Sequence, residues 1–360
     1  MRRSFIRSKY AAIFLVMALA GGCASRQAAP MQPADPHSVP LSAPIVIAHR
    51  GASGERPEHT IAAYELAIAQ GADVIEPDLV PTSDGVLVAR HENEIGETTD
   101  VAAHPEFAGR HTTKMIDGRA VTGWFTEDFT LAELKTLRAR ERLPQLRPGN
   151  RAFDGQETIP TLDEVIALAK QHKVAIYPET KHPTYFAAIG KGTDAPLVAA
   201  LRRAGWDDAQ APVFIQSFEV KNLQRLKSMT QVRLIQLIDG AAGPADGAAR
   251  SYADMVTPEG LKAISAYAWG IGPNKAMLWQ GTVPSGIVRD AHAAGLRVHP
   301  WTYRAENQFL PAAYRRADDP QGQGDLHAEI SAALGLGIDG FFTDFPAIGV
   351  RARNGARGAQ

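Results

Sequence analysis

From residue 45 onward, short apolar runs alternate with segments of helical periodicity. Nine apolar runs have the length of a strand, namely residues 45–48, 74–80, 86–89, 174–177, 213–215, 232–238, 268–271, 296–299 and 340–343. Helical patterns lie between them and include residues 61–72, capped by Thr60, residues 162–172, capped by Thr161, and residues 219–229. This alternation predicts βα units and a parallel sheet.

One pair of runs departs from the parallel pattern. Only residues 81–85 separate the run that ends at Val80 from the run that begins at Val86. A parallel crossover needs about a dozen residues or more, whereas Asp84-Gly85 is a hairpin turn signal. We therefore expect residues 86–91 to fold back antiparallel on residues 74–80. Eight candidate parallel strands remain, which is the number in a TIM (β/α)8 barrel, where active sites lie at the carboxyl ends of the strands.

The alternation lapses between residues 92 and 159, where one helical pattern at 131–140 stands among Gly, Pro, Thr and His. This stretch is too long for a plain loop, so we interpret it as an insertion after the second strand. It is either a lid over one end of the barrel or a structural subdomain without contact to substrate. The barrel is expected to span residues 45–350, followed by a tail at 351–360, and residues 240–252 to form a long surface loop.

Composition and charge exclude several classes of protein. The chain has 360 residues, with 38 Lys and Arg against 39 Asp and Glu, and one cysteine. One cysteine cannot build a disulfide framework, and a net charge of −1 argues against a broad basic face for nucleic acid. A hydrophobic fraction of 45% and a charged fraction of 21% are typical of globular domains. We expect no nucleic-acid partner and infer no obligate protein partner.

The first 22 residues differ from the rest in charge. They contain four basic residues, no acidic residue and the apolar run 11–20. A basic start, a short apolar stretch and small residues at its end predict a signal peptide. Ten apolar residues are too few to cross a hydrocarbon core of about 30 Å as a helix.

The single cysteine, Cys23, follows Gly21-Gly22, and this stretch resembles a bacterial lipobox, in which the cysteine is lipidated. The alternative is a secreted periplasmic protein with an incidental cysteine. Residues 23–44 are rich in Ala, Pro and Ser and predict a flexible tether. Ala24 and Ser25, in place of Asp, imply a periplasm-facing lipoprotein of the outer membrane. Without the leader, 34 basic residues (38 minus 4) face 39 acidic ones, for a net charge of −5.

Polar residues follow the apolar runs directly, where a barrel would bring them to one rim. Glu76 and Asp78 are spaced i, i+2, so their side chains leave the same face of a strand. With Glu179 from another strand they offer three oxygen ligands, a set suited to one Ca²⁺ or Mg²⁺. Zinc would be expected to recruit histidine or thiolate ligands.

Two histidines and two cations accompany these carboxylates. Arg50 and Lys181 can bind an anionic group such as phosphate. His49 and His91 can divide the roles of general acid and general base. A metal, cations and a histidine pair are the groups that phosphodiester cleavage requires.

The order of these motifs resembles the glycerophosphodiester phosphodiesterase family, specifically its larger periplasmic branch. The matching segments cover nearly all of residues 45–350 and are residues 49–54, 57–60, 76–78, 82–86, 91, 177–181, 216–218, 270–273, 299–302 and 343–346. The resemblance implies a TIM barrel with an insertion after the second strand. It also implies hydrolysis of small glycerophosphodiesters to glycerol 3-phosphate and an alcohol, through a cyclic phosphate.

Residue by residue, the resemblance assigns catalysis to His49 and His91, metal binding to Glu76, Asp78 and Glu179, and phosphate binding to Arg50 and Lys181. Three positions depart from the family pattern. Glu92 stands where Asp is usual, and Pro77 and Thr180 replace residues that are usually apolar.

Further assignments stay open at the level of sequence. His59 could line the glycerol pocket or support the start of a helix, and Phe218, Trp301, Tyr303 and Phe342 could form the pocket wall or pack in the barrel. Two other functions are alternatives: a phosphodiesterase for a larger substrate, such as a teichoic-acid-like polymer or a lysophospholipid, and a surface lipoprotein that binds a partner with a barrel scaffold.

Overall fold

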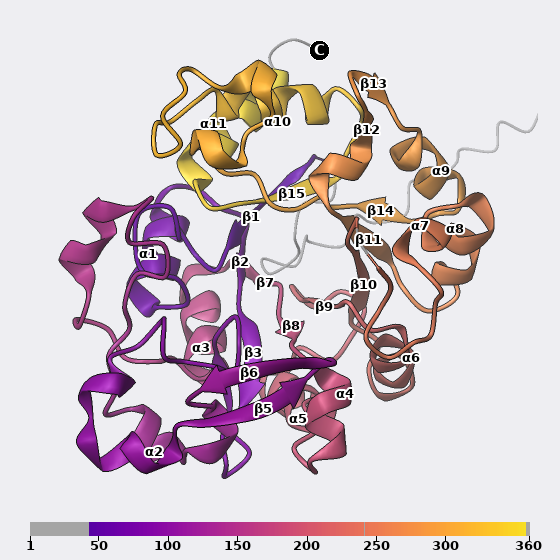
Figure 1. Cartoon of the computed structure of the whole chain (residues 1–360). Helices are drawn as coiled ribbons and strands as arrows, with labels where there is room; N and C mark the ends of the chain where they lie inside the picture. The colour runs from indigo at the N-terminus through magenta and orange to yellow at the C-terminus, as the bar shows by residue number, and fades with distance from the viewer. Residues whose placement is uncertain (1–42, 241, 358–360) are drawn as a thin grey trace, which may run out of the picture. The chain divides into compact units, whose positions relative to one another are not determined.

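A closed ring of parallel strands organises residues 43–240 and 242–357, the part of the chain that the computed structural model describes (Figure 1). In ring order the strands are β1 (Ile45–His49), β2 (Val74–Glu76) with β3 (Asp78–Pro81), β7 (Ala175–Ile176) with β8 (Glu179–Thr180), β9 (Phe214–Ser217), β10 (Arg233–Ile238), β11 (Gly270–Pro273), β14 (Arg297–Val298) and β15 (Gly340–Thr343). β1 pairs with β15, and the amide of Phe342 donates to the carbonyl of Pro300 at 3.0 Å beside β14. The ring is a TIM barrel, as predicted.

Helices follow the strands around the ring. They are α1 (Ile61–Ala69), α3 (Leu162–His172), α4 (Pro183–Ala188), α5 (Asp194–Ala204), α6 (Val220–Met229), α7 (Tyr252–Met255), α8 (Pro258–Ile264), α9 (Ile287–Ala293), α10 (Leu326–Leu334) and α11 (Pro346–Arg357). Thr60 caps α1, since its side chain accepts from the amide of Ala63 at 3.1 Å. Thr161 and Glu164 form a capping box at the start of α3. None of the helices in the described residues is both long and apolar enough to cross a membrane.

Two prolines interrupt the second and third strand positions. Residues 74–80 were expected as one strand, but Pro77 divides them into β2, which pairs with β1 and β7, and β3, which pairs with β4 (Leu87–Ala89) and β8. Pro178 divides β7 from β8 in the same way. Proline has no backbone N–H to donate, so the ladder breaks there. The expected hairpin is confirmed: β3 and β4 are antiparallel, with Val80 opposite Val88.

The stretch after β4 forms a small layer with its own core. It contains the hairpin β5 (Thr112–Ile116) and β6 (Arg119–Gly123), α2 (Leu131–Leu134), and the 3-10 turns η1 (Val101–Ala103), η2 (Pro105–Arg110), η3 (Thr126–Asp128) and η4 (Pro148–Phe153). Its apolar residues pack on Val80 and Val88 of the β3–β4 hairpin and on Phe186 of α4. The helix expected at 131–140 ends at Leu134, because Ala139 instead donates its amide to the carbonyl of Glu157.

The end of the chain differs from the expected boundary. The tail expected from residue 351 begins inside α11, which continues to Arg357 because Ala352 is fully buried and α11 packs on α10 and β1. The loop before Tyr252 is irregular in its described residues, as expected. Short pieces complete the fold: β12 (Trp279–Gln280), β13 (Val283–Pro284), and the 3-10 turns η5 (Lys275–Leu278), η6 (Asn307–Phe309) and η7 (Ala312–Tyr314). The predicted leader at 1–22 and Cys23 lie outside the described residues, as does the tether except for its last two residues.

Candidate active site

A small cavity of about 80 Å³ opens where the barrel strands end. It is lined by six of the seven residues predicted for catalysis, metal binding or phosphate binding, namely His49, Arg50, Glu76, His91, Glu179 and Lys181. Strand register explains why they meet: His49 of β1 pairs with Glu76 of β2, and Asp78 of β3 pairs with Glu179 of β8. The seventh residue, Asp78, lies beside the cavity and is 1% exposed.

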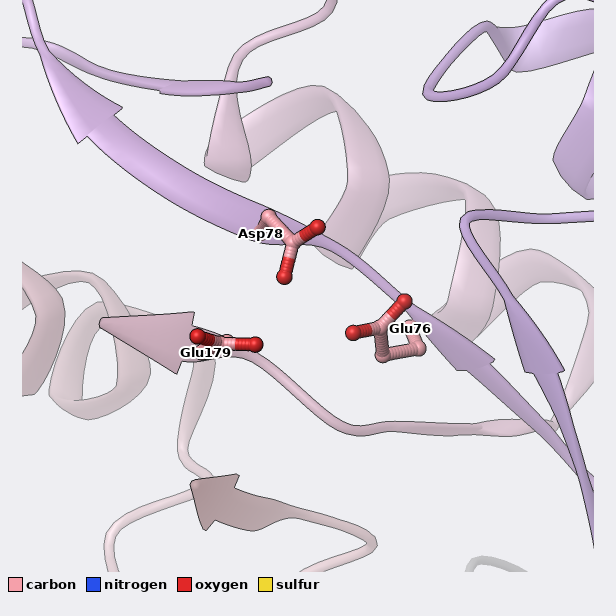
Figure 2. A group of neighbouring side chains, drawn as sticks. All are labelled: Glu76, Asp78 and Glu179. Carbon is pink, nitrogen blue, oxygen red and sulfur yellow. The ribbon is translucent and has the colours of Figure 1, made fainter. Parts of the chain in front are cut away.

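Three carboxylates converge at this point. Glu76, Asp78 and Glu179 each offer an oxygen within 4.8 Å of the other two. Figure 2 shows the three groups facing a common space, with Glu76 and Asp78 on either side of the break in the second strand position and Glu179 beside them. The break at Pro77 thus keeps both carboxylates on one side, as their spacing predicts.

The hydrogen bonds around the carboxylates leave room for a ligand. Glu76 accepts from the amide of Arg50 at 2.7 Å and from Nε2 of Gln216 at 2.9 Å. Asp78 Oδ2 lies 2.9 Å from Nε2 of His59, but its Oδ1 is buried without any hydrogen-bond partner among the described residues. A buried carboxylate oxygen without a partner is costly. Three hard oxygen donors, one of them unsatisfied, fit a divalent cation such as Ca²⁺ or Mg²⁺.

Burial and the neighbouring charges shift the pKa of each of the three carboxyl groups. Burial, followed by the charge of Asp78, raises the pKa of Glu76 well above its usual value. Burial also raises the pKa of Glu179 to about 8, although Lys181, at 3.0 Å from its Oε1, acts in the opposite direction. For Asp78, burial is outweighed by Lys181, His59 and Arg50, which hold its pKa well below the usual value. A bound cation would favour the ionised form of all three.

His49 is held by a buried ion-pair network. Its Nδ1 lies 2.6 Å from Oδ1 of Asp344, the residue that follows β15. The other oxygen of Asp344 accepts from Arg147 at 2.5 Å and from Nε of Arg304 at 2.9 Å. Arg147 comes from the insertion and also donates to Glu306 at 2.6 Å. Since the pKa of Asp344 is held well below its usual value by Arg304 and Arg147 against the effect of burial, it stays a carboxylate that accepts from His49 Nδ1–H.

His91 is linked to the insertion hairpin through two further residues. Its Nδ1 lies 3.1 Å from Oε1 of Glu92, and Oε2 of Glu92 lies 2.8 Å from Nε2 of His182. Nδ1 of His182 lies 2.5 Å from Asp117 at the tip of the β5–β6 hairpin. The extra methylene of Glu92, relative to the Asp usual in the family, lets one side chain contact both histidines. Burial, then Arg50 and Lys181, lowers the pKa of His91 well below its usual value.

Arg50 sits in a backbone conformation that aims it at the carboxylates. Its φ is 60°, and Gly51 follows at 86°, where a Cβ would come within 2.7 Å of the backbone of Ala63. The guanidinium lies 3.2 Å from Asp78 and 3.1 Å from Glu58. Burial alone would lower the pKa of Arg50, but Glu58 and Asp78 raise it, so Arg50 is permanently charged at the cavity wall.

A second cavity of about 750 Å³ adjoins the first and is formed by the insertion and the barrel rim. His91, Glu179, Lys181 and Phe218 line both cavities. The insertion contributes Asp117 and other residues of the β5–β6 hairpin to its wall. Figure 1 shows this hairpin running from the insertion past β3 toward α4. The insertion therefore forms part of the wall of the cavity beside the catalytic one.

Several open assignments are resolved by burial. His59 is fully buried, bridges Asp78 and the hydroxyl of Tyr64, and lines neither cavity, so its role is to position Asp78. Phe218, Trp301 and Phe342 line the small cavity. Tyr303 is 1% exposed and belongs to the barrel core, so of the two roles left open for it the structure has the packing role.

Sequence reasoning missed the partners of the predicted residues. Asp344 lies within the matching segment 343–346, but the sequence assigned no role to it. Glu58 entered only as a member of the matching segment 57–60, and Arg147 and Arg304 were not predicted as site residues. All three are ion-paired within the network around Arg50 and Asp344. The Trp301–Arg304 segment follows the eighth apolar run of the sequence, which was the available signal for Arg304. Arg147 lies in an irregular stretch and gives no such signal.

Comparisons with known proteins agree with this geometry. Residues 49–348 match the model of the glycerophosphoryl diester phosphodiesterase family. A glycerophosphodiester phosphodiesterase of Arabidopsis thaliana is 37% identical over 92% of this chain and 93% of its own length. One from Haemophilus influenzae is 31% identical over 87% of this chain and 90% of its own.

Solved structures share the fold. A phosphodiesterase of Oleispira antarctica, solved in complex with its product sn-glycerol-3-phosphate, has a TM-score of 0.59 and 22% identity, covering 87% of this chain and 98% of that one. A glycerophosphodiester phosphodiesterase of Agrobacterium tumefaciens has a TM-score of 0.56 and 21% identity, covering 86% of this chain and 99% of that one. With a family match over most of its length and a site built from the residues of that match, the chain belongs to the glycerophosphoryl diester phosphodiesterase family.

Proposed function

We propose that this protein hydrolyses small glycerophosphodiesters to sn-glycerol 3-phosphate and an alcohol, by metal-assisted catalysis with two histidines. The observation that carries the proposal is the small cavity, where His49, His91 and Lys181 lie next to the three clustered carboxylates. Family membership and the names of the relatives from Arabidopsis and Haemophilus support the substrate class.

The phosphate of the substrate is held by the cations of the small cavity. Arg50, Lys181 and Arg304 line it, and each carries its positive charge close to the two histidines. Glu76, Asp78 and Glu179 would hold one divalent cation, Ca²⁺ or Mg²⁺, which when bound supplies further positive charge to the phosphate oxygens. In a buried site these charges stabilise the extra negative charge of the transition state.

His49 is the general base. Its Nδ1–H is held by Asp344, so Nε2 keeps the lone pair. Burial, then Arg50, lowers its pKa to about 4, and the imidazole is therefore neutral and ready to accept a proton at pH 7. His49 takes the proton of the glycerol 2-hydroxyl, whose oxygen attacks phosphorus and displaces the alcohol, leaving a cyclic phosphate that water then opens.

His91 is the general acid for the leaving alcohol. It lies where the two cavities meet, between the phosphate and the space available to the departing group. A bound phosphodiester anion offsets Arg50 and Lys181, the cations that disfavour protonation of His91. Glu92, at 3.1 Å from Nδ1, stabilises the imidazolium that donates its proton to the leaving oxygen.

The test is release of sn-glycerol 3-phosphate from glycerophosphocholine, with and without EDTA and with Ca²⁺ or Mg²⁺ restored. We expect His49→Ala and His91→Ala each to lower kcat by about 10²-fold or more. The control is His172→Ala, an exposed histidine at the end of α3. Full activity in both site variants would overturn the mechanism, and activity that persists without any divalent cation would overturn the role of the metal.

We also propose that Cys23 is lipidated and anchors the enzyme to the periplasmic face of a bacterial cell envelope, at the outer membrane. The support is the basic leader, its apolar run and the Gly21-Gly22-Cys23 exit. Mass spectrometry of the protein from bacterial membranes should show a diacylglyceryl group on Cys23, and Cys23→Ser should release the protein into the soluble fraction. An unmodified Cys23 in a processed, soluble protein would favour simple secretion.

A further inference from the structure

The larger cavity differs from the catalytic one in its charge. Seven carboxylates and three Lys or Arg side chains line it, together with His182, which pairs with two of the carboxylates, Glu92 and Asp117. Two of the three cations are already paired, Lys181 with Glu179 and Arg142 with Glu58. On the barrel side, Glu219 and Asp239 have no ion-pair partner within 4.0 Å among the described residues. This wall therefore carries negative charge that the neighbouring side chains do not neutralise.

Glu219 shows this excess most clearly. It is 2% exposed, and its carboxylate accepts from the amide and the hydroxyl of Thr184 but from no cation. Burial raises its pKa, and the charges of Asp117 and Asp246 raise it further. A cation placed between Glu219 and Asp239 would be attracted by both.

Aromatic rings mark the passage between the two cavities. Phe218 lines both, and its ring stands edge-to-face with Trp301, at 5.6 Å between centroids, and with Tyr252, at 6.3 Å. Rings at right angles present electron-rich faces in more than one direction, the arrangement that recognises ammonium groups. The ammonium of Lys181 already lies 6.0 Å from the Phe218 ring.

We infer that the larger cavity binds the leaving alcohol and selects diesters whose alcohol carries an ammonium group. This inference rests on the proposed function and adds a preference to it. The two cavities then match a zwitterion: the cations of the catalytic cavity face the phosphate, and the carboxylates and aromatic rings of the larger cavity face the positive end. Its volume of about 750 Å³ exceeds what such a headgroup needs, so selection comes from charge and not from size.

The experiment compares two diesters that differ in one atom. Glycerophosphocholine has a quaternary nitrogen, and the matching diester of 3,3-dimethylbutanol has carbon in its place. We expect kcat/KM for the choline diester to be about tenfold higher in the wild-type protein. Asp239→Asn and Tyr252→Leu should each lower that ratio by about threefold or more. The matched control, Asp254→Asn, removes an exposed carboxylate outside the cavity and should leave the ratio unchanged.

A binding measurement separates this inference from the proposed function. Calorimetry with choline alone, and with 3,3-dimethylbutanol alone, reports on the larger cavity without turnover. Choline binding that is weakened by Asp239→Asn supports the cavity even if no diester is hydrolysed, an outcome that would reject the proposed function. Hydrolysis of both diesters at equal kcat/KM, with no binding of choline above that of the neutral alcohol, would overturn the selectivity and leave the proposed function intact.

Discussion

The imidazole of His49 and the carboxylate of Asp344 are joined by a 2.6 Å contact between Nδ1 and Oδ1 across 295 positions of sequence. The contact exists because the barrel closes: His49 ends the first strand, and Asp344 follows the last strand, which pairs with it. The residue that orients the base thus depends on the completed ring of strands.

Asp344→Asn should reduce kcat by about 10²- to 10⁴-fold with little change in KM. An amide can donate to His49 Nδ1, which favours the wrong tautomer and places a proton on the nitrogen that must accept one. Steady-state kinetics measure the effect. The control is Asp318→Asn, which changes an exposed carboxylate that makes no hydrogen bond among the described residues. Its kcat should match that of the wild type. A normal kcat for Asp344→Asn would show that the contact between His49 and Asp344 is not needed for catalysis.

Arg147→Met should destabilise the fold as well as slow the reaction. Arg147 is 5% exposed and pairs with Asp344 and Glu306, which are buried. Removing one partner of a buried ion pair leaves a charge uncompensated, which costs about 3–5 kcal/mol. Urea denaturation measures the loss, and Arg151→Met, an exposed arginine of the same turn, provides the comparison. Equal midpoints for the two variants would contradict the role of Arg147.

Arg147 also shows where prediction from sequence ended. The strand-end residues His49, Glu76, Asp78 and Glu179 could be located because strand C-termini meet at one rim whatever the loops do. Arg147 reaches the same rim from the insertion, 197 positions before its partner Asp344. The position of Arg147 depends on how the insertion packs on the β3–β4 hairpin and α4. The pattern of apolar and polar residues around Arg147 does not predict this packing.

The two prolines are a second, more local case. Pro77 stands inside a run of apolar residues, and such a run predicts one continuous strand at residues 74–80. Because Pro77 and Pro178 occupy neighbouring strand positions, the ladder breaks twice in the same layer of the barrel. Asp78 and Glu179 then begin new strand segments in register with one another. The periodicity of one strand does not predict this register, because it depends on breaks in two neighbouring strands.

Divalent cations should stabilise the protein through the three carboxylates. We expect Ca²⁺ or Mg²⁺ to raise the Tm of the wild-type protein after EDTA treatment, because a ligand that binds only the folded state stabilises it. In EDTA alone, Glu179→Gln should unfold at a higher temperature than the wild type, since it removes one of three crowded buried carboxylates. The same variant should lose most of the stabilisation by cation. A cation-induced shift that is equal in both proteins would place the ion elsewhere.

His182 should make stability depend on pH in the alkaline range. Asp117 and Glu92 outweigh the effect of burial and raise its pKa from 6.5 to about 9. A raised pKa means that the folded state binds the proton more tightly than the unfolded state. The stabilisation is therefore complete below pH 6.5 and is lost as the pH rises through about 9. The full shift corresponds to about 3 kcal/mol, and partial exposure of Glu92 reduces this to about 2 kcal/mol.

Denaturation of the wild type and of His182→Gln between pH 6 and 9.5 isolates the contribution of His182 as the difference between the two curves of unfolding free energy against pH. Glu92→Asp is the second comparison: the shorter side chain reaches His91 or His182 but not both, so the pH dependence should shrink while His91 remains in place. Parallel curves for the wild type and His182→Gln across this range would show that the hairpin tip is held by other contacts.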